Sequence, residues 1–105
     1  MTGSVRLTPW PLSEAPTEAH IRRMLADDGL DPYSWSNAAH DVYAAHNHSY
    51  DKVIFVVTGS ITFGLPDENR KITLIPGDRL DLPAGLVHDA VVGEEGVVCL
   101  EAHGG

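Results

Sequence analysis

Residues 77–88 read GDRLDLPAGLVH, a run of turn signals and strand residues that ends in a histidine. Its opening glycine permits a turn with positive φ, and Pro83 with Gly85 builds a rigid corner that can aim His88 inward. Beyond His88, strand alternation places small apolar residues on the same face as the histidine, through Val92. The stretch therefore predicts a histidine set against a small, apolar wall.

A second histidine cluster lies upstream, in the sequence HNH at residues 46–48. Alternate side chains of a strand share a face, so His46 and His48 can chelate one ion while His88 arrives from elsewhere in the fold. Neutral imidazoles are good ligands for transition metals, and three of them leave positions open for water or substrate. On the upstream strand, Val42 and Ala44 share the face of His46, which predicts an apolar pocket around a divalent metal.

Set beside their glycines, these clusters resemble the two metal-binding motifs of the cupin family. The second family motif places a glycine, a proline, another glycine and a histidine at fixed spacing, and the chain matches it at Gly77, Pro83, Gly85 and His88. The asparagine that usually follows is replaced by Val92.

The first family motif is matched at His46, His48 and Gly59, with two departures. His40 stands at the position of the opening glycine, and Lys52 stands at the position of the glutamate that supplies a fourth ligand in the family. The resemblance covers about residues 33–101. It implies an all-β fold, a small antiparallel jelly-roll barrel with one short N-terminal helix, and a homodimer.

Lys52 leaves three alternatives for the site, because a lysine ammonium offers no lone pair to a metal. Asp51 could replace the missing carboxylate if the turn after His48 is bulged. The site could instead use three histidines, with Lys52 paired to an acid such as Asp51 or Asp89, or to a bound anion. Finally, the metal could be lost and the cavity used for organic ligands alone. Strict alternation places Asp51 on the face opposite Lys52, which favours the three-histidine site.

The chain of 105 residues fits a single domain, with an arm and helix at residues 1–32 and the barrel at residues 33–105. Thr17 and Gly29 are start and stop signals that predict a helix over residues 17–28. Short strands are expected over residues 72–75, 79–82, 90–92 and 97–100. A hairpin is expected in which residues 53–57 and 61–63 flank a tight turn at residues 58–60.

Charge and cysteine content limit the compartment and the partners. Fifteen acids against seven bases give a net charge of −8, which argues against nucleic acid as a partner. No apolar run approaches the roughly 20 residues that span a bilayer, and the N-terminus shows no secretion signal. The single cysteine, Cys99, cannot form an internal disulfide and is expected to be buried. Together these features predict a cytoplasmic protein without membrane contact.

The functional prediction is a small metalloenzyme that acts on a small organic substrate, one that is anionic if Lys52 faces the cavity. Iron would favour dioxygenase chemistry, whereas zinc, nickel or manganese would favour isomerisation or hydrolysis. The alternative is a non-catalytic binding or sensor module. Catalytic residues are not identified by the sequence; Asp51, Asp89 and the more distant His40 are the candidate general bases. The tyrosines and tryptophans are interpreted as core or interface residues, and His20 and His103 are given no role.

Overall fold

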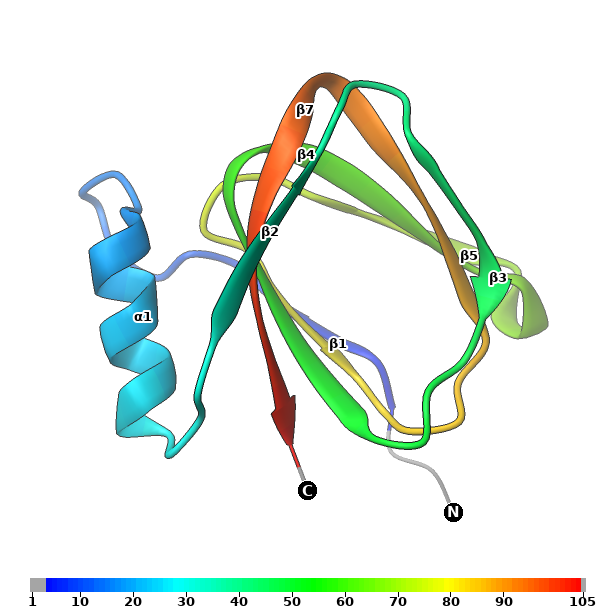
Figure 1. Ribbon diagram of the computed structural model, residues 1–105, viewed down its shortest axis with the longest axis horizontal. Coiled ribbons are helices and arrows are strands. Elements are labelled where there is room, and N and C mark those ends of the chain that lie inside the picture. Colours follow the sequence, from blue (N-terminus) through cyan, green and yellow to red (C-terminus); the bar gives the residue numbers. More distant parts are fainter. Residues whose placement is uncertain (1–3, 105) are drawn as a thin grey trace.

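The computed structural model describes residues 4–104, and its strands curve into a barrel with the helix of this part of the chain on the outside (Figure 1). The elements in chain order are β1 (Arg6–Thr8), α1 (Glu18–Asp27), β2 (Tyr33–Asn37), β3 (Val42–His46), β4 (Asp51–Leu65), the 3-10 turn η1 (Pro66–Glu68), β5 (Arg70–Leu74), β6 (Arg79–Leu82) and β7 (His88–Gly104). This arrangement confirms the expectation of a small all-β antiparallel barrel with one short helix.

The two longest strands, β4 and β7, pair with each other and contribute to both walls of the barrel. Residues 52–55 of β4 pair with β6, and residues 61–65 pair with β5. On the other side, the first part of β7 pairs with β3 and its later part pairs with β2. One wall therefore runs β1-β6-β4-β7-β2, while the other contains β5, β4, β7 and β3. All pairs are antiparallel.

The predicted hairpin at residues 58–60 is wrong, because β4 continues through it as one bent strand. Gly59 has a φ of +78°, and the register with β7 shifts on both sides of it. Gly96, with a φ of +76°, lies at the matching bend of β7. The two segments expected as separate strands, 90–92 and 97–100, therefore belong to one strand. Glycine followed by alternating residues permits either a reversal or a bulge, and here pairing with β7 on both sides of the glycine selects the bulge.

Two buried clusters hold the fold together. The larger fills the barrel with apolar side chains from both walls, Leu74, Leu80 and Val92 among them. The smaller joins Ile21 and Leu25 of α1 to the outer face of the β4–β7 pair. Thr17 caps α1 by accepting a hydrogen bond from the backbone N–H of His20, as the sequence predicted.

The N-terminal segment is part of the sheet over three residues, since β1 pairs with the edge of β6. Val5 is buried in the barrel core, whereas Leu7 and Leu12 are exposed. Cys99 is fully buried as expected, and burial raises the pKa of its thiol to about 12. Within residues 4–104, none of the helical structure has the length and apolar character that crossing a bilayer requires.

Candidate metal-binding site

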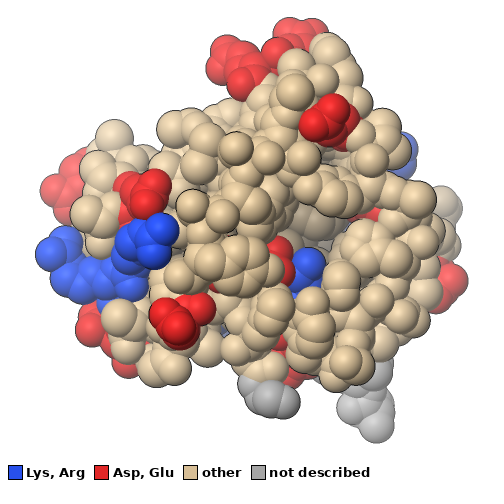
Figure 2. Space-filling model, in the orientation of Figure 1, with Lys and Arg blue, Asp and Glu red and all other residues tan. Residues whose placement is uncertain are grey.

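A cavity of about 320 Å³ opens between the two walls of the barrel. Figure 2 shows its mouth as a hollow with basic and acidic atoms inside, surrounded by uncharged residues. Lys52 and Glu101 are the lysine and the acid in its lining. The full lining is Tyr33, Trp35, Tyr43, His46, His48, Tyr50, Lys52, Ile54, Ile61, Phe63, His88, Ala90 and Glu101. A volume of this size suits a small organic molecule.

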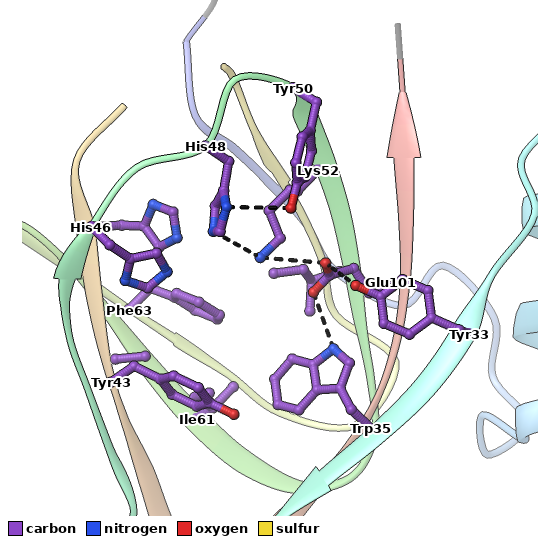
Figure 3. Close-up of a pocket in the computed structure, with 13 residues that line it drawn as sticks. Tyr33, Trp35, Tyr43, His46, His48, Tyr50, Lys52, Ile61, Phe63 and Glu101 are labelled. Atoms are coloured by element: carbon purple, nitrogen blue, oxygen red, sulfur yellow. Dashed lines mark hydrogen bonds and ion pairs between the residues drawn. The ribbon is translucent and has the colours of Figure 1, made fainter. Parts of the chain in front are cut away.

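The three histidines that the sequence singled out come together in the lining of this cavity, and Figure 3 shows His46 and His48 at one end of it. His46 ends β3 and pairs in register with His88, the first residue of β7, while His48 lies in the connection that follows β3. Their nitrogen ligand atoms all lie within 4.8 Å of one another. The Pro83–Gly85 corner precedes His88 as predicted, with a φ of +82° at Gly85.

Two of the histidines are fixed in one tautomer by carbonyl oxygens. The Nδ1 of His46 lies 2.6 Å from the Ala44 oxygen, and the Nδ1 of His88 lies 3.0 Å from the Leu86 oxygen. A carbonyl only accepts, so both Nδ1 atoms carry a proton, and in the neutral form of each imidazole the lone pair is on Nε2. Burial lowers the pKa of His88, which favours the neutral form that a metal requires.

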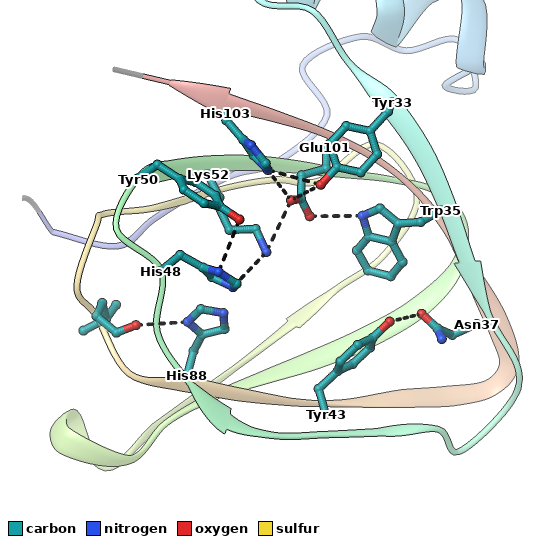
Figure 4. A network of polar contacts seen from close by, with 11 residues as sticks. Tyr33, Trp35, Asn37, Tyr43, His48, Tyr50, Lys52, His88, Glu101 and His103 are labelled. Atoms are coloured by element: carbon teal, nitrogen blue, oxygen red, sulfur yellow. Dashed lines mark hydrogen bonds and ion pairs between the residues drawn. The ribbon is translucent and has the colours of Figure 1, made fainter.

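His48 is oriented by side chains instead. Its Nε2 lies 3.4 Å from the Lys52 Nζ, and its Nδ1 lies 3.3 Å from the Tyr50 hydroxyl (Figure 4). The ammonium donates, so Nε2 holds a lone pair here too and Nδ1 donates to the tyrosine. Burial and the charge of Lys52 lower the pKa of His48. All three imidazoles therefore have a metal-binding nitrogen, although the one on His48 accepts a hydrogen bond from Lys52.

Lys52 does pair with an acid, but the acid is Glu101. The Lys52 Nζ lies 3.3 Å from Oε2 of Glu101, and both side chains are nearly buried. Asp51, on the opposite face of β4, instead accepts a hydrogen bond from the backbone N–H of Ala84 at 2.8 Å. Asp89 packs over Gly64, away from the cavity lining. The two aspartates suggested as partners or bases are therefore not brought to the histidines.

Glu101 is the most densely bonded side chain of the site. Its Oε2 accepts from the Tyr33 hydroxyl at 2.5 Å and from the His103 Nε2 at 2.9 Å, and its Oε1 accepts from the Trp35 Nε1 at 3.0 Å. Burial alone would raise the pKa of Glu101, but these hydrogen bonds and the charge of Lys52 outweigh it and lower the pKa. Burial and the neighbouring carboxylate raise the pKa of Tyr33. The glutamate is thus held as a fixed negative charge.

The prediction that Val42 and Ala44 of β3 face the pocket together with His46 is wrong, because neither lines the cavity. The register of β3 shifts between Tyr43 and His46, so these two side chains face the cavity together. Val42, expected on the inner face, is 73% exposed. The bulge inverts the alternation that the prediction assumed. Ala90 and Val92 of β7 are buried as predicted.

Solved structures identify the architecture. A cupin superfamily protein from Desulfitobacterium hafniense matches with a TM-score of 0.62 and 16% identity, over 98% of this chain and 79% of that chain. The chain has the cupin fold. KdgF from Halomonas sp. is similar to this chain with a TM-score of 0.58 and 29% identity, over 70% and 67% of the two chains. The polyketide cyclase RemF from Streptomyces resistomycificus gives 0.62 and 24%, over 74% and 58%. No protein-family model and no curated protein matches the sequence.

Several residues that line this cavity or contact its lining were missed by sequence reasoning. Glu101 and His103 occupy alternate positions on β7, so both face the same side of the strand, and that spacing is the signal that could have found them. Tyr33, Trp35, Tyr43 and Tyr50 line the cavity, which corrects their interpretation as core or interface residues. His40 lies outside the cavity lining, where its backbone contacts the bend of β7.

Proposed function

We propose that this cupin binds one divalent transition metal through His46, His48 and His88 and converts a small anionic organic substrate beside it. The observation that carries the proposal is the convergence of imidazole nitrogens from three histidines within 4.8 Å at one end of a small-molecule cavity. Three nitrogen ligands suit iron, zinc, nickel or manganese and leave coordination positions for a substrate.

The charges around the cavity support an anionic substrate. Lys52 and Glu101 compensate each other, and lowered pKa values favour the neutral forms of His48 and His88, so a divalent ion would give the cavity a net positive charge. Once bound, such an ion supplies Lewis-acid polarisation, or redox chemistry if it is iron. The chain itself supplies an apolar, aromatic enclosure that limits water and orients the substrate.

A second candidate function is binding of an organic ligand without a metal. It is favoured by one contact, the hydrogen bond from Lys52 to the Nε2 of His48, because that lone pair is then not free for a metal. Metal binding in this cupin must displace Lys52 from His48. We therefore expect a weaker metal affinity than an unobstructed set of three histidines would have.

Metal content decides between the two candidates. The protein would be purified without a histidine tag or chelator, dialysed against each metal, and measured by elemental analysis. We expect about one metal per chain, lost in His88→Ala. Since His88 is nearly buried, His46→Ala is a second variant in case the first misfolds. His20→Ala, on α1 and outside the cavity lining, is the matched control and should keep the metal.

Substrate screening would follow the metal that is found, with turnover compared before and after chelation. Absence of metal after dialysis against all four ions would contradict the metalloenzyme proposal and leave the second candidate. Stoichiometric metal without turnover of small carboxylates would favour a sensor or binding role.

A further inference from the structure

The cavity has two chemically different ends, and together they specify a ligand. One end holds the histidines and Lys52, the other is built from Trp35, Tyr43 and Ile61, and Phe63 lies beside His88 (Figure 3). We propose that the cavity binds a small carboxylate that carries a flat ring, with the carboxylate paired to Lys52 and the ring against the aromatic side chains. This deepens the proposed function by naming a substrate class, and it rests on that proposal only in sharing the same cavity.

Trp35 and Tyr43 can contact a ligand through their rings, because their polar atoms already form hydrogen bonds within the protein. The Tyr43 hydroxyl donates to Asn37, and the Trp35 Nε1 donates to Glu101 (Figure 4). The Trp35 and Tyr43 rings meet edge to face with centroids 6.2 Å apart. With these polar groups satisfied, the rings present apolar surface to the cavity, and such surface favours offset or edge contacts with another ring.

Lys52 can pair with a ligand carboxylate without leaving Glu101 unpaired. Glu101 keeps three other donors, from Tyr33, Trp35 and His103, if the ammonium turns toward a ligand. Lys52 has three N–H donors, and its contacts with Glu101 and His48 use two of them. One donor is therefore free for an anion before any existing contact breaks.

The same network argues against a cationic ligand. Four donors already converge on the Glu101 carboxylate, and Lys52 lies between that carboxylate and the histidines (Figure 4). An organic cation, unlike a metal ion, gains no coordination bond from the histidines that would offset its repulsion by the ammonium of Lys52 in a partly enclosed site. The chemistry selects an anion despite the net charge of −8 on the whole chain.

Benzoate and three analogues test the proposal by isothermal titration calorimetry on the full chain. Benzamide keeps the ring and removes the charge, cyclohexanecarboxylate keeps the charge and removes the flat ring, and acetate has no ring. We expect one benzoate per chain. Benzamide should bind at least about tenfold more weakly, since a charged hydrogen bond is lost. Cyclohexanecarboxylate and acetate should also bind more weakly than benzoate.

Lys52→Met should abolish the preference for benzoate over benzamide, whereas Lys71→Met, an exposed lysine of β5 outside the cavity lining, should preserve it. If Lys52→Met misfolds, Trp35→Leu serves as the second variant and should weaken benzoate more than acetate. Equal affinity for benzoate and benzamide, or no saturable benzoate binding, would overturn the proposal. Equal affinity for cyclohexanecarboxylate would overturn its aromatic part.

The titrations are run both with chelator and with added zinc, so that this inference and the metal proposal fail separately. Benzoate binding without any metal uptake supports the ligand class and rejects the metalloenzyme. Metal uptake without a preference for benzoate rejects the ligand class and leaves the metal site in place.

Discussion

Glu101 is buried, with a pKa below its ordinary value, and this makes stability depend on pH. Its ionised form is favoured in the folded chain, so its stabilisation is complete above the unfolded pKa of about 4.3 and is lost as the pH falls through the lower folded pKa. Glu101→Gln should cost about 3 kcal/mol at neutral pH, because Lys52 is left buried without a counter-charge and the amide group faces donors.

The measurement is urea unfolding of wild type and Glu101→Gln at pH 7 and near pH 3. The difference between the two proteins should shrink at the lower pH, since the wild-type carboxyl is then becoming protonated. Glu95→Gln, at an exposed glutamate on β7, should behave as wild type at both values. Parallel loss of stability in wild type and Glu101→Gln would show that other groups set the acid limit.

The positions of some site residues could be predicted from the sequence, whereas those of others could not. His46, His48 and His88 lie in matched motifs whose glycines and proline fix the local backbone, so their convergence could be predicted. The ion pair between Glu101 and Lys52 could not be predicted. Glu101 lies on β7, and the register shifts at the bend of that strand change which of its side chains face the cavity. The inward position of Tyr43 was hidden for the same reason, since a bulge leaves little signal in the residues around it.

The bends of β4 and β7 depend on close backbone contact at Gly59. A Cβ there would lie 2.0 Å from the carbonyl oxygen of Gly96, and the φ of +78° is unfavourable for alanine. Gly59→Ala should therefore destabilise the protein by about 3 kcal/mol or more, from backbone strain plus a contact that neither strand can relieve.

Gly29 provides a matched control, since its φ is +76° but no atom lies within 4 Å of the added Cβ. Gly29→Ala should cost only the backbone strain, about 1 kcal/mol. Both variants would be compared by urea unfolding. Equal losses would contradict a role for close packing at the β4–β7 bend and leave conformational preference as the whole effect.

These bends also explain which elements the sequence could predict. The α1 helix and β6 are set by local signals, a cap at Thr17 and the turns that flank Arg79–Leu82, and both are found where expected. The sequence around Gly59 contains the same signal for a hairpin turn as for a bulge. Only the partner strand distinguishes them, and the residue of β7 that pairs with Gly59, Val97, is distant in sequence.

The barrel as a whole could be predicted, because the spacing of its glycines, proline and histidines resembles the two motifs of the cupin family. The chemical nature of the cavity was harder to predict from the sequence, since its lining comes from β2, β3, β4 and β7 and from the connection after β3. Which aromatic residues face inward depends on how these strands stack. The sequence could therefore indicate a metal and a fold, whereas the aromatic end of the cavity required the assembled barrel.

The three histidines join separate parts of the barrel, so metal binding should stabilise the whole chain. His46 and His48 come from β3 and its following connection, and His88 begins β7. A metal that binds only the folded protein adds about 2.7 kcal/mol at a concentration of 100 times its Kd. Zinc should raise the thermal midpoint of wild type and slow amide exchange in β3, which contains the proposed ligand His46. The increase should vanish in His46→Ala and persist in His20→Ala. An increase that survives in His46→Ala would place the zinc elsewhere, because a site missing one of three ligands cannot give the full effect.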